Sequence, residues 1–271
     1  MKSHFLLLVV LGMVLPFATT SCNKDDEAQE KPRLGVIEIR MFENIDSVPR
    51  VLQLRCETQE IFRCCNWRIT HTASVSEDVI DIRFKDIFVP DVCLTALGPA
   101  TAQIDPGSLS EGTYNLNLSA PDSHNGGELI VNDDYYKLNF PHTNKFVFPY
   151  DQLNRIPEHT IWGHVGYHSE DTEPLVESFI DDLSELGAEP GDYLTGEYGY
   201  FRILDTGEIE TSEHHGYHLI KPFIFDYQED MSSVEELVKY YGQNHGDDLN
   251  ISVFTCSGES FLSWTYSGND D

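Results

Sequence analysis

The chain has 271 residues, of which 40% are hydrophobic and 11% aromatic, enough apolar side chains for packed cores. It carries 17 basic and 46 acidic residues, a formal net charge of −29, and residues 151–271 alone carry −22. A surface this acidic repels nucleic acids and anionic lipids, which excludes nucleic-acid binding and leaves basic proteins or divalent cations as compatible partners. The simpler alternative is that the acidity only keeps a surface protein soluble.

Residues 1–21 are predicted to be a secretory signal peptide. The apolar run from Phe5 to Leu15 follows Lys2 and is too short to span a bilayer. Small and hydroxyl residues then lead directly to Cys22. This arrangement resembles a bacterial lipobox, which implies that the Cys22 thiol is acylated and anchors the chain in a membrane. The alternative is an ordinary signal followed by a chance cysteine.

Residues 22–33 are polar and are predicted to be a flexible tether. After Cys22 and Asn23 come Lys24, Asp25, Asp26 and Glu27. This short motif resembles the surface-export signal of Bacteroidota lipoproteins, and a generic charged tether is the alternative. The resemblance implies an outer-membrane protein that is exposed on the cell surface.

Residues 34–148 are predicted to form an antiparallel β-sandwich, because apolar and polar residues alternate in short runs separated by turn residues. The runs are 36–41, 51–54, 67–70, 79–84, 114–118, 128–131 and 135–140, and Gly126-Gly127 is expected to be a turn before one of them. The blocks CLTALGPA, GTYNLNLS and GELIVNDDYYKLNF look similar to the small Ig-like β modules of Bacteroidota surface lipoproteins. This resemblance implies a spacer or binding module without catalytic residues, and Asp46-Ser47-Val48 resembles the glycosylation acceptor motif of the same phylum.

The six cysteines indicate an oxidising compartment. With Cys22 lipidated, we predict one disulfide from Cys64 or Cys65 to Cys93, because neighbouring cysteines on one strand point to opposite faces. Zinc is the rival interpretation, but the chain has no CxxC pair. Cys256 is expected to be a buried free thiol.

Residues 149–157 contain Pro149 and Pro157 and are predicted to link the sandwich to an acidic α+β domain over 158–271. Strands are expected at 161–167, 198–204, 208–210 and 219–227, with a closing hairpin at 251–256 and 261–264. One helix should begin at Asp171 or Thr172 and end at Gly187, and a second should run from Ser232 through Tyr241. Pro222 indicates that the strand 219–227 is an edge or bulged strand. This order fits two helices on one face of an antiparallel sheet, as in a ferredoxin-like βαββαβ layer.

Candidate site residues are few. A loop with Glu213, His214, His215 and His218 could hold a metal ion, with surface histidines beside a turn as the alternative. His164 and His168 are excluded as a pair, since residues four apart on a strand lie about 13 Å apart. A sugar ring or peptide could dock on Glu197, Tyr198 and Tyr200, with packed tyrosines as the alternative.

The sequence contains no nucleophile elbow, phosphate-binding glycine loop or calcium loop, so we expect no cofactor. The leading hypothesis is a non-enzymatic surface lipoprotein that binds a protein or glycan through its acidic C-terminal domain. The alternatives are a secreted metal-dependent hydrolase that uses the histidine loop, and a blocker that resembles a protease inhibitor.

Overall fold

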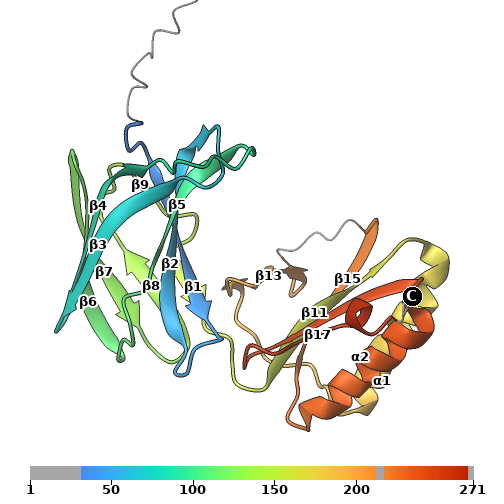
Figure 1. Ribbon diagram of the computed structural model, residues 1–271. Helices are drawn as coiled ribbons and strands as arrows, with labels where there is room; N and C mark the ends of the chain where they lie inside the picture. The colour runs from blue at the N-terminus through green and yellow to red at the C-terminus, as the bar shows by residue number, and fades with distance from the viewer. Residues whose placement is uncertain (1–31, 212–216, 268–271) are drawn as a thin grey trace, which may run out of the picture. The chain divides into compact units, whose positions relative to one another are not determined.

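The computed structural model describes residues 32–211 and 217–267, and from Arg33 onward the chain forms one compact unit (Figure 1). The predicted lipidation at Cys22 and the export signal Lys24, Asp25, Asp26 and Glu27 lie outside the described residues. Among the helices that are described, none is long and apolar enough to cross a membrane.

Thirteen strands of the described residues form one sheet in the order β14-β13-β12-β10-β8-β7-β6-β4-β3-β5-β2-β1-β9. The strands of its N-terminal part are β1 (Ile37–Asn44), β2 (Val51–Phe62), β3 (Arg68–Ser76), β4 (Val79–Phe88), β5 (Gly98–Ile104), β6 (Gly112–Ala120), β7 (Ser123–Val131), β8 (Tyr135–Asn139) and β9 (Phe146–Val147). Most neighbours in this part are antiparallel, whereas β4 pairs with β6, β1 with β9 and β3 with β5 in parallel.

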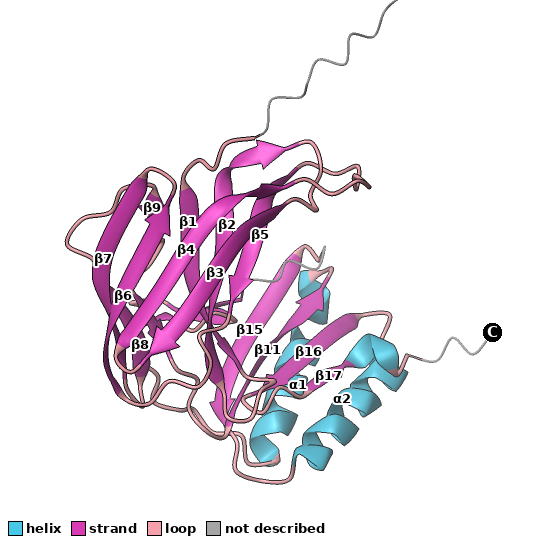
Figure 2. Ribbon diagram, turned by 60° about the vertical axis from the view of Figure 1, so that its left-hand side comes forward, coloured by secondary structure: helices cyan, strands magenta, loops and turns pink. Residues whose placement is uncertain are grey.

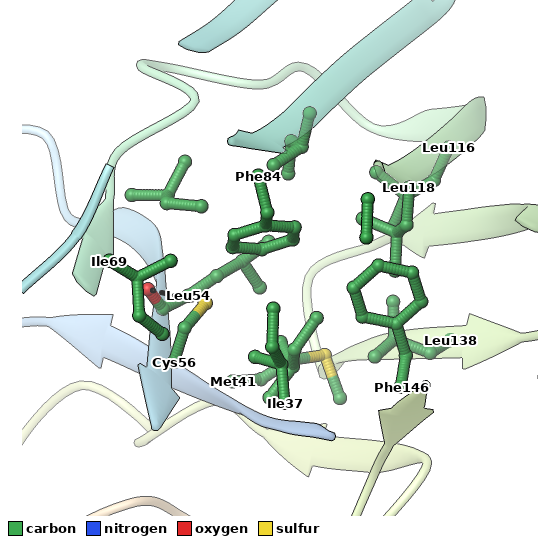
Figure 3. Packing of buried hydrophobic residues seen from close by; sticks show 14 of the residues in the cluster. Ile37, Met41, Leu54, Cys56, Ile69, Phe84, Leu116, Leu118, Leu138 and Phe146 are labelled. Atoms are coloured by element: carbon green, nitrogen blue, oxygen red, sulfur yellow. Dashed lines mark hydrogen bonds between the residues drawn. The ribbon is translucent and has the colours of Figure 1, made fainter. Parts of the chain in front are cut away.

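This sheet folds around one apolar core, as the predicted β-sandwich requires (Figures 2 and 3). Alternate residues of each strand point inward, for example Ile37, Ile39 and Met41 on β1, all at most 1% exposed. The ring of Phe84 on β4 lies 5.5 Å from that of Phe146 on β9, so strands from distant positions in the sheet pack face to face. The alternation seen in the sequence therefore reflects burial of one face.

Two features of the sandwich differ from the sequence-based expectation. Gly126 and Gly127 are not a turn but lie within β7, and the hairpin turns instead at Pro121 and Asp122. Gly127 is needed for close packing, because a Cβ there would collide with the ring of Phe140. The strand β5, in the middle of the sheet, was not predicted.

The remaining strands of the large sheet come from later in the chain: β10 (Gln152–Asn154), β12 (Gly196–Glu197), β13 (Phe201–Ile203) and β14 (Ile209–Thr211). The segment 149–157, expected to be a linker, therefore contributes β10, which pairs with β8 on one side and β12 on the other. The predicted strand 198–204 is shorter than expected, because Tyr198 to Tyr200 form the turn between β12 and β13.

A separate sheet has the order β15-β11-β16-β17, with all neighbours antiparallel. Its elements are β11 (Thr160–Tyr167), α1 (Glu173–Glu185), β15 (Leu219–Asp226), α2 (Met231–His245), β16 (Leu249–Thr255) and β17 (Ser260–Leu262). Both helices lie on one face of this sheet, which makes it the smaller α+β part (Figure 2). Every residue of β11 is buried, as expected for a central strand covered on both faces.

The helix ends follow the predicted chemistry with two changes. Thr172 precedes α1 but makes no side-chain cap, and Ser169 instead accepts a hydrogen bond from the Asp171 backbone, at the start of a short 3-10 turn. The cap of α2 is Asp230, whose carboxylate accepts from the Ser232 backbone, rather than Ser232 itself. Gly187 closes α1 with φ of +103°, as predicted.

Candidate binding site

The strand β15 has one free edge, because it is the last strand of its sheet. The Tyr227 N–H donates to the His159 carbonyl. In an antiparallel pair every second residue bonds to the neighbouring strand, so the backbone groups of Phe225, Phe223 and Lys221 point to β11 and those of the residues between them point away from it. Ile220, Pro222 and Ile224 therefore direct their backbone groups to the free edge. Pro222 has no N–H to offer and costs the sheet no hydrogen bond at this position. The prediction that Pro222 marks an edge strand is confirmed.

A groove of about 580 Å³ lies along this edge. One wall is β15 from Lys221 to Phe225, and the other is the β13–β14 hairpin, from Leu204 and from Gly207 to Glu210, with Ile180 of α1 also lining it. The two walls belong to different sheets, each ending here in an edge strand. The groove is therefore bounded on two sides by edge strands, but β14 and β15 also contact each other along part of its length, so the groove is open only beside that contact.

The charges at the groove are mostly negative. Glu208 and Glu210 line the hairpin wall, and the one basic lining residue, Lys221, is held by Glu177 of α1, with 2.9 Å between Nζ and Oε1. That pairing raises the pKa of Lys221. The groove also lies in the half of the chain that carries −22. A positively charged ligand therefore meets a favourable field here.

The predicted docking residues Glu197, Tyr198 and Tyr200 do not form one exposed surface. Tyr198 is 1% exposed, stacks on Phe201 with ring centroids 4.7 Å apart, and donates its hydroxyl to the Leu194 carbonyl. Tyr200 is half-buried, with its ring 4.5 Å from that of Phe42. These tyrosines are thus packing residues, which was the alternative interpretation.

Glu197 keeps partial exposure and belongs to a short charged row. Across β12, β13 and β14 the partners in register are Glu197, Arg202 and Glu210, and Arg202 Nε lies 3.4 Å from Glu197 Oε1. Burial raises the pKa of Glu197, against the lowering effect of Arg202. The row ends at Glu210 on the wall of the groove.

Only part of the predicted histidine-rich metal site lies among the described residues. Glu213, His214 and His215 lie outside the described residues. His218 is described, and its ring centroid lies 6.2 Å from that of His168. His164 is buried on β11, with Nε2 3.3 Å from the Ser252 hydroxyl. Within residues 32–211 and 217–267, no group of three or more His, Cys, Asp or Glu side chains could hold a metal ion.

The disulfide prediction is confirmed, since Cys64 is bonded to Cys93. Cys64 and Cys65 lie in the turn after β2 rather than on a strand, which places Cys64 in the core and Cys65 at the surface. Cys256 is a free thiol but half-buried, not buried as predicted. Ser47 of the glycosylation-like motif lies in the turn between β1 and β2, next to Val48, which is 99% exposed.

A buried ionic cluster was missed by the sequence analysis. Glu43 on β1 is 0% exposed, and its carboxylate accepts a 2.8 Å hydrogen bond from Arg155 Nε and a 3.3 Å bond from the Tyr136 hydroxyl. Arg50 lies 3.6 Å from its other oxygen. Burial and the nearby Glu43 raise the pKa of Tyr136 to about 12. The cluster ties β1 to the chain that leads into β11, which is a structural role.

Comparisons with protein-family models, with curated proteins and with solved structures give no match for this chain.

Proposed function

We propose that the protein is a binding protein that takes up an extended, basic segment of another protein along the free edge of β15. The observation that carries this proposal is the groove between two edge strands. An extended peptide that adds to a sheet edge gains main-chain hydrogen bonds, and its alternate side chains provide specificity.

The outward backbone groups of β15 set the length of such a peptide. From Ile220 to Ile224 the edge offers three carbonyl acceptors and two N–H donors, since Pro222 lacks one. At roughly 3.4 Å per residue this stretch spans about 14 Å, or about five residues of a partner strand. At Asp226 the edge is already closed, because Asp226 and Glu189 exchange backbone hydrogen bonds of 2.8 and 3.0 Å.

A basic partner is favoured by charge. Glu208 and Glu210 line the groove and Lys221 is already paired with Glu177, so lysine or arginine side chains of a peptide would find unneutralised carboxylates. The surrounding −22 charge would also raise the association rate at low ionic strength.

The test uses a fluorescent, end-capped octapeptide of alternating lysine and valine, with a glutamate–valine octapeptide as its charge control. Ile224→Pro removes an outward N–H without touching the β11 ladder, and Ile224→Val is the matched variant that keeps it. We expect the lysine peptide alone to bind, with affinity reduced at least tenfold by Ile224→Pro and unchanged by Ile224→Val. Equal binding to both Ile224 variants, or no binding of the lysine peptide, overturns the proposal.

We further propose that Cys22 is acylated and that the mature protein is anchored in the outer membrane, facing outward. This rests on the lipobox-like sequence and on Lys24, Asp25, Asp26 and Glu27. Protease shaving of intact cells should clip the native protein but spare a variant with Asp25 and Asp26 both changed to Ala. Cys22→Ala should release the protein from the membrane fraction. Resistance of the native, lipidated protein to shaving would instead place it in the periplasm.

The finer topology of the α+β part supports a relationship to the ferredoxin-like layer. In β15–α2–β16 the two strands are both antiparallel to β11, which lies between them, so they form a split βαβ unit. The fourth strand, β17, lies beyond β16. The segment after α1, which would supply a fourth strand beside β15 in that layer, instead forms β12, β13 and β14. We propose a variant in which this segment was diverted to build the groove.

A further inference from the structure

Four polar side chains lie in line across the outer face of the sandwich. In the register of β3, β4, β6 and β7, Thr72 is opposite Arg83, Arg83 beside Ser119, and Ser119 opposite His124. The neighbouring Ile82 and Leu118 are each 1% exposed and face the core, so the four residues of the row lie on the opposite face of the sheet. Thr72, Arg83 and His124 are exposed, whereas Ser119 is 8% exposed and its hydroxyl donates a 3.4 Å hydrogen bond to the Ile82 carbonyl. We call these four residues the cross-strand row.

The surface over the cross-strand row is hollow. One cavity of about 360 Å³ is lined by the whole row together with Ser74, Asp81 and Asn117. A second cavity of about 390 Å³ shares Arg83, Ser119 and His124 with the first and adds Lys85. These sizes are typical of small-molecule sites.

The cross-strand row carries positive charge that no carboxylate neutralises among the described residues. In a protein of net charge −29, Arg83 and Lys85 both line the second cavity. Six other basic residues among those described are paired with carboxylates, but none of the described residues forms an ion pair with Arg83 or Lys85. Asp81, the acidic residue of the first cavity, accepts a 2.9 Å hydrogen bond from Asn117 Nδ2.

These groups define the chemistry of a ligand. A guanidinium matches the two oxygens of a carboxylate or sulfate. The hydroxyl of Thr72 and the Asp81–Asn117 pair suit ligand hydroxyl groups, and the Ser119 oxygen, whose proton is donated to Ile82, can accept one further hydrogen bond. The first cavity has no Phe, Tyr or Trp in its lining, and Phe84 of the second points into the core, so the imidazole of His124 is the one exposed ring in either lining (Figure 3). The chain's net charge repels a long polyanion strongly and a ligand with one or two acidic groups far less, because the repulsion grows with the charge of the ligand.

We infer that the cross-strand row is a binding site for a short acidic saccharide, with its carboxylate or sulfate on Arg83 and its hydroxyls on the flanking polar groups. This site is independent of the groove at β15, and either could exist without the other.

The test titrates the isotope-labelled chain from Asn23 onward with glucuronate, glucose and inorganic sulfate, and follows the backbone amide signals. We expect glucuronate to shift the amides of Thr72, Arg83, Ser119 and His124 in a saturable way, at least tenfold more tightly than glucose or sulfate does. Arg83→Gln should weaken glucuronate binding at least tenfold. Arg68→Gln is the matched control, since Arg68 is exposed on β3 but lines neither cavity.

Three outcomes overturn the inference. The first is that glucuronate leaves these amides unmoved. The second is that sulfate binds as tightly as glucuronate, which leaves an adventitious ion only. The third is that Arg68→Gln weakens binding as much as Arg83→Gln does. Because Arg83 is exposed, its variant should unfold at the same temperature as the native chain, so that loss of binding is not loss of the fold.

Discussion

Replacing Glu43 by glutamine would test whether the buried ionic cluster holds β1 to the chain that enters the α+β part. The change keeps the size of the side chain but removes its charge. Arg155 Nε lies 2.8 Å from the Glu43 carboxylate and would at most donate to the neutral amide oxygen of the glutamine. Arg50 would lose the negative charge of Glu43, its carboxylate partner in the cluster. Both arginine side chains are largely buried, at 22% and 21% exposure, so water compensates them only in part.

The expected cost follows from the burial. Removing one partner of a buried ion pair costs about 3–5 kcal/mol, and the partial exposure of the two arginines places this case near about 3 kcal/mol. In a domain of this size each kcal/mol lowers Tm by about 2–4 °C, so Glu43→Gln should lower Tm by about 6–12 °C. Glu38→Gln is the matched control on the same strand. Its partner Arg40 is 56% exposed, and loss of an exposed pair costs about 0–1 kcal/mol.

Thermal unfolding followed by circular dichroism measures both variants under the same conditions. A fall in Tm for Glu43→Gln that is no larger than for Glu38→Gln would refute the reasoning, since burial would then add nothing to the pair. A double-mutant cycle of Glu43→Gln with Arg155→Gln provides a second check. The double variant should be less unstable than the sum of the two single changes.

Three further outcomes are expected. Cys64→Ser should lower the free energy of unfolding, measured by guanidinium denaturation, by about 3 kcal/mol, because the disulfide closes a loop with a sequence separation of 29. Cys65→Ser, at an exposed free thiol, should change that free energy little. Gly163→Ala should destabilise strongly, because its Cβ would overlap the Ser252 carbonyl, while Gly126→Ala on β7 has its nearest neighbour at 3.8 Å and should not; a similar midpoint for both variants would contradict this packing argument. Burial raises the pKa of Tyr136 and Tyr198 to about 12, above the value of about 10 in an unfolded chain, so these groups contribute stability that is full below pH 10 and is lost as the pH rises from 10 to 12. The measurement is the tyrosinate absorbance of the folded protein, with Tyr→Phe variants to assign the signal of each residue. Ionisation of either residue near pH 10 while the protein is still folded would contradict the expectation.

Much of the fold could be predicted where one physical cause controls a local pattern. Alternating burial identified β1, β4 and β6, because each has one face in the core. Pro222 identified an edge strand, because a missing N–H is tolerated only where no neighbour needs it. The bridge to Cys93 was predicted with Cys64 and Cys65 as equal candidates, and the structure selects Cys64 through a turn rather than through the alternation of a strand.

The errors share a different cause, which is contact with residues far away in the sequence. The strand β5 begins with Gly98 and Pro99, which disfavour strands, and it forms because β2 and β3 flank it. Gly127 resembled a turn residue, but its role is to make room for Phe140. Glu43 and Arg155 carry no signal of their partnership, since 112 positions separate them. The groove could not be predicted either, since Ile209 and Ile224 become neighbours only through the ends of two different sheets.

The path of residues 196–211 also has a consequence for synthesis. These residues follow α1 in the chain, yet they complete the sheet that begins at β1. The chain is synthesised from its N-terminus, so β10 can pair with β8 on one side while its other edge stays open until β12, roughly forty residues later, has appeared. During that interval the incomplete sandwich presents an open strand edge, a stage at which a holding chaperone would protect it from pairing with another chain. A stop codon placed between β10 and β12 should therefore yield a fragment that aggregates rather than a smaller folded protein.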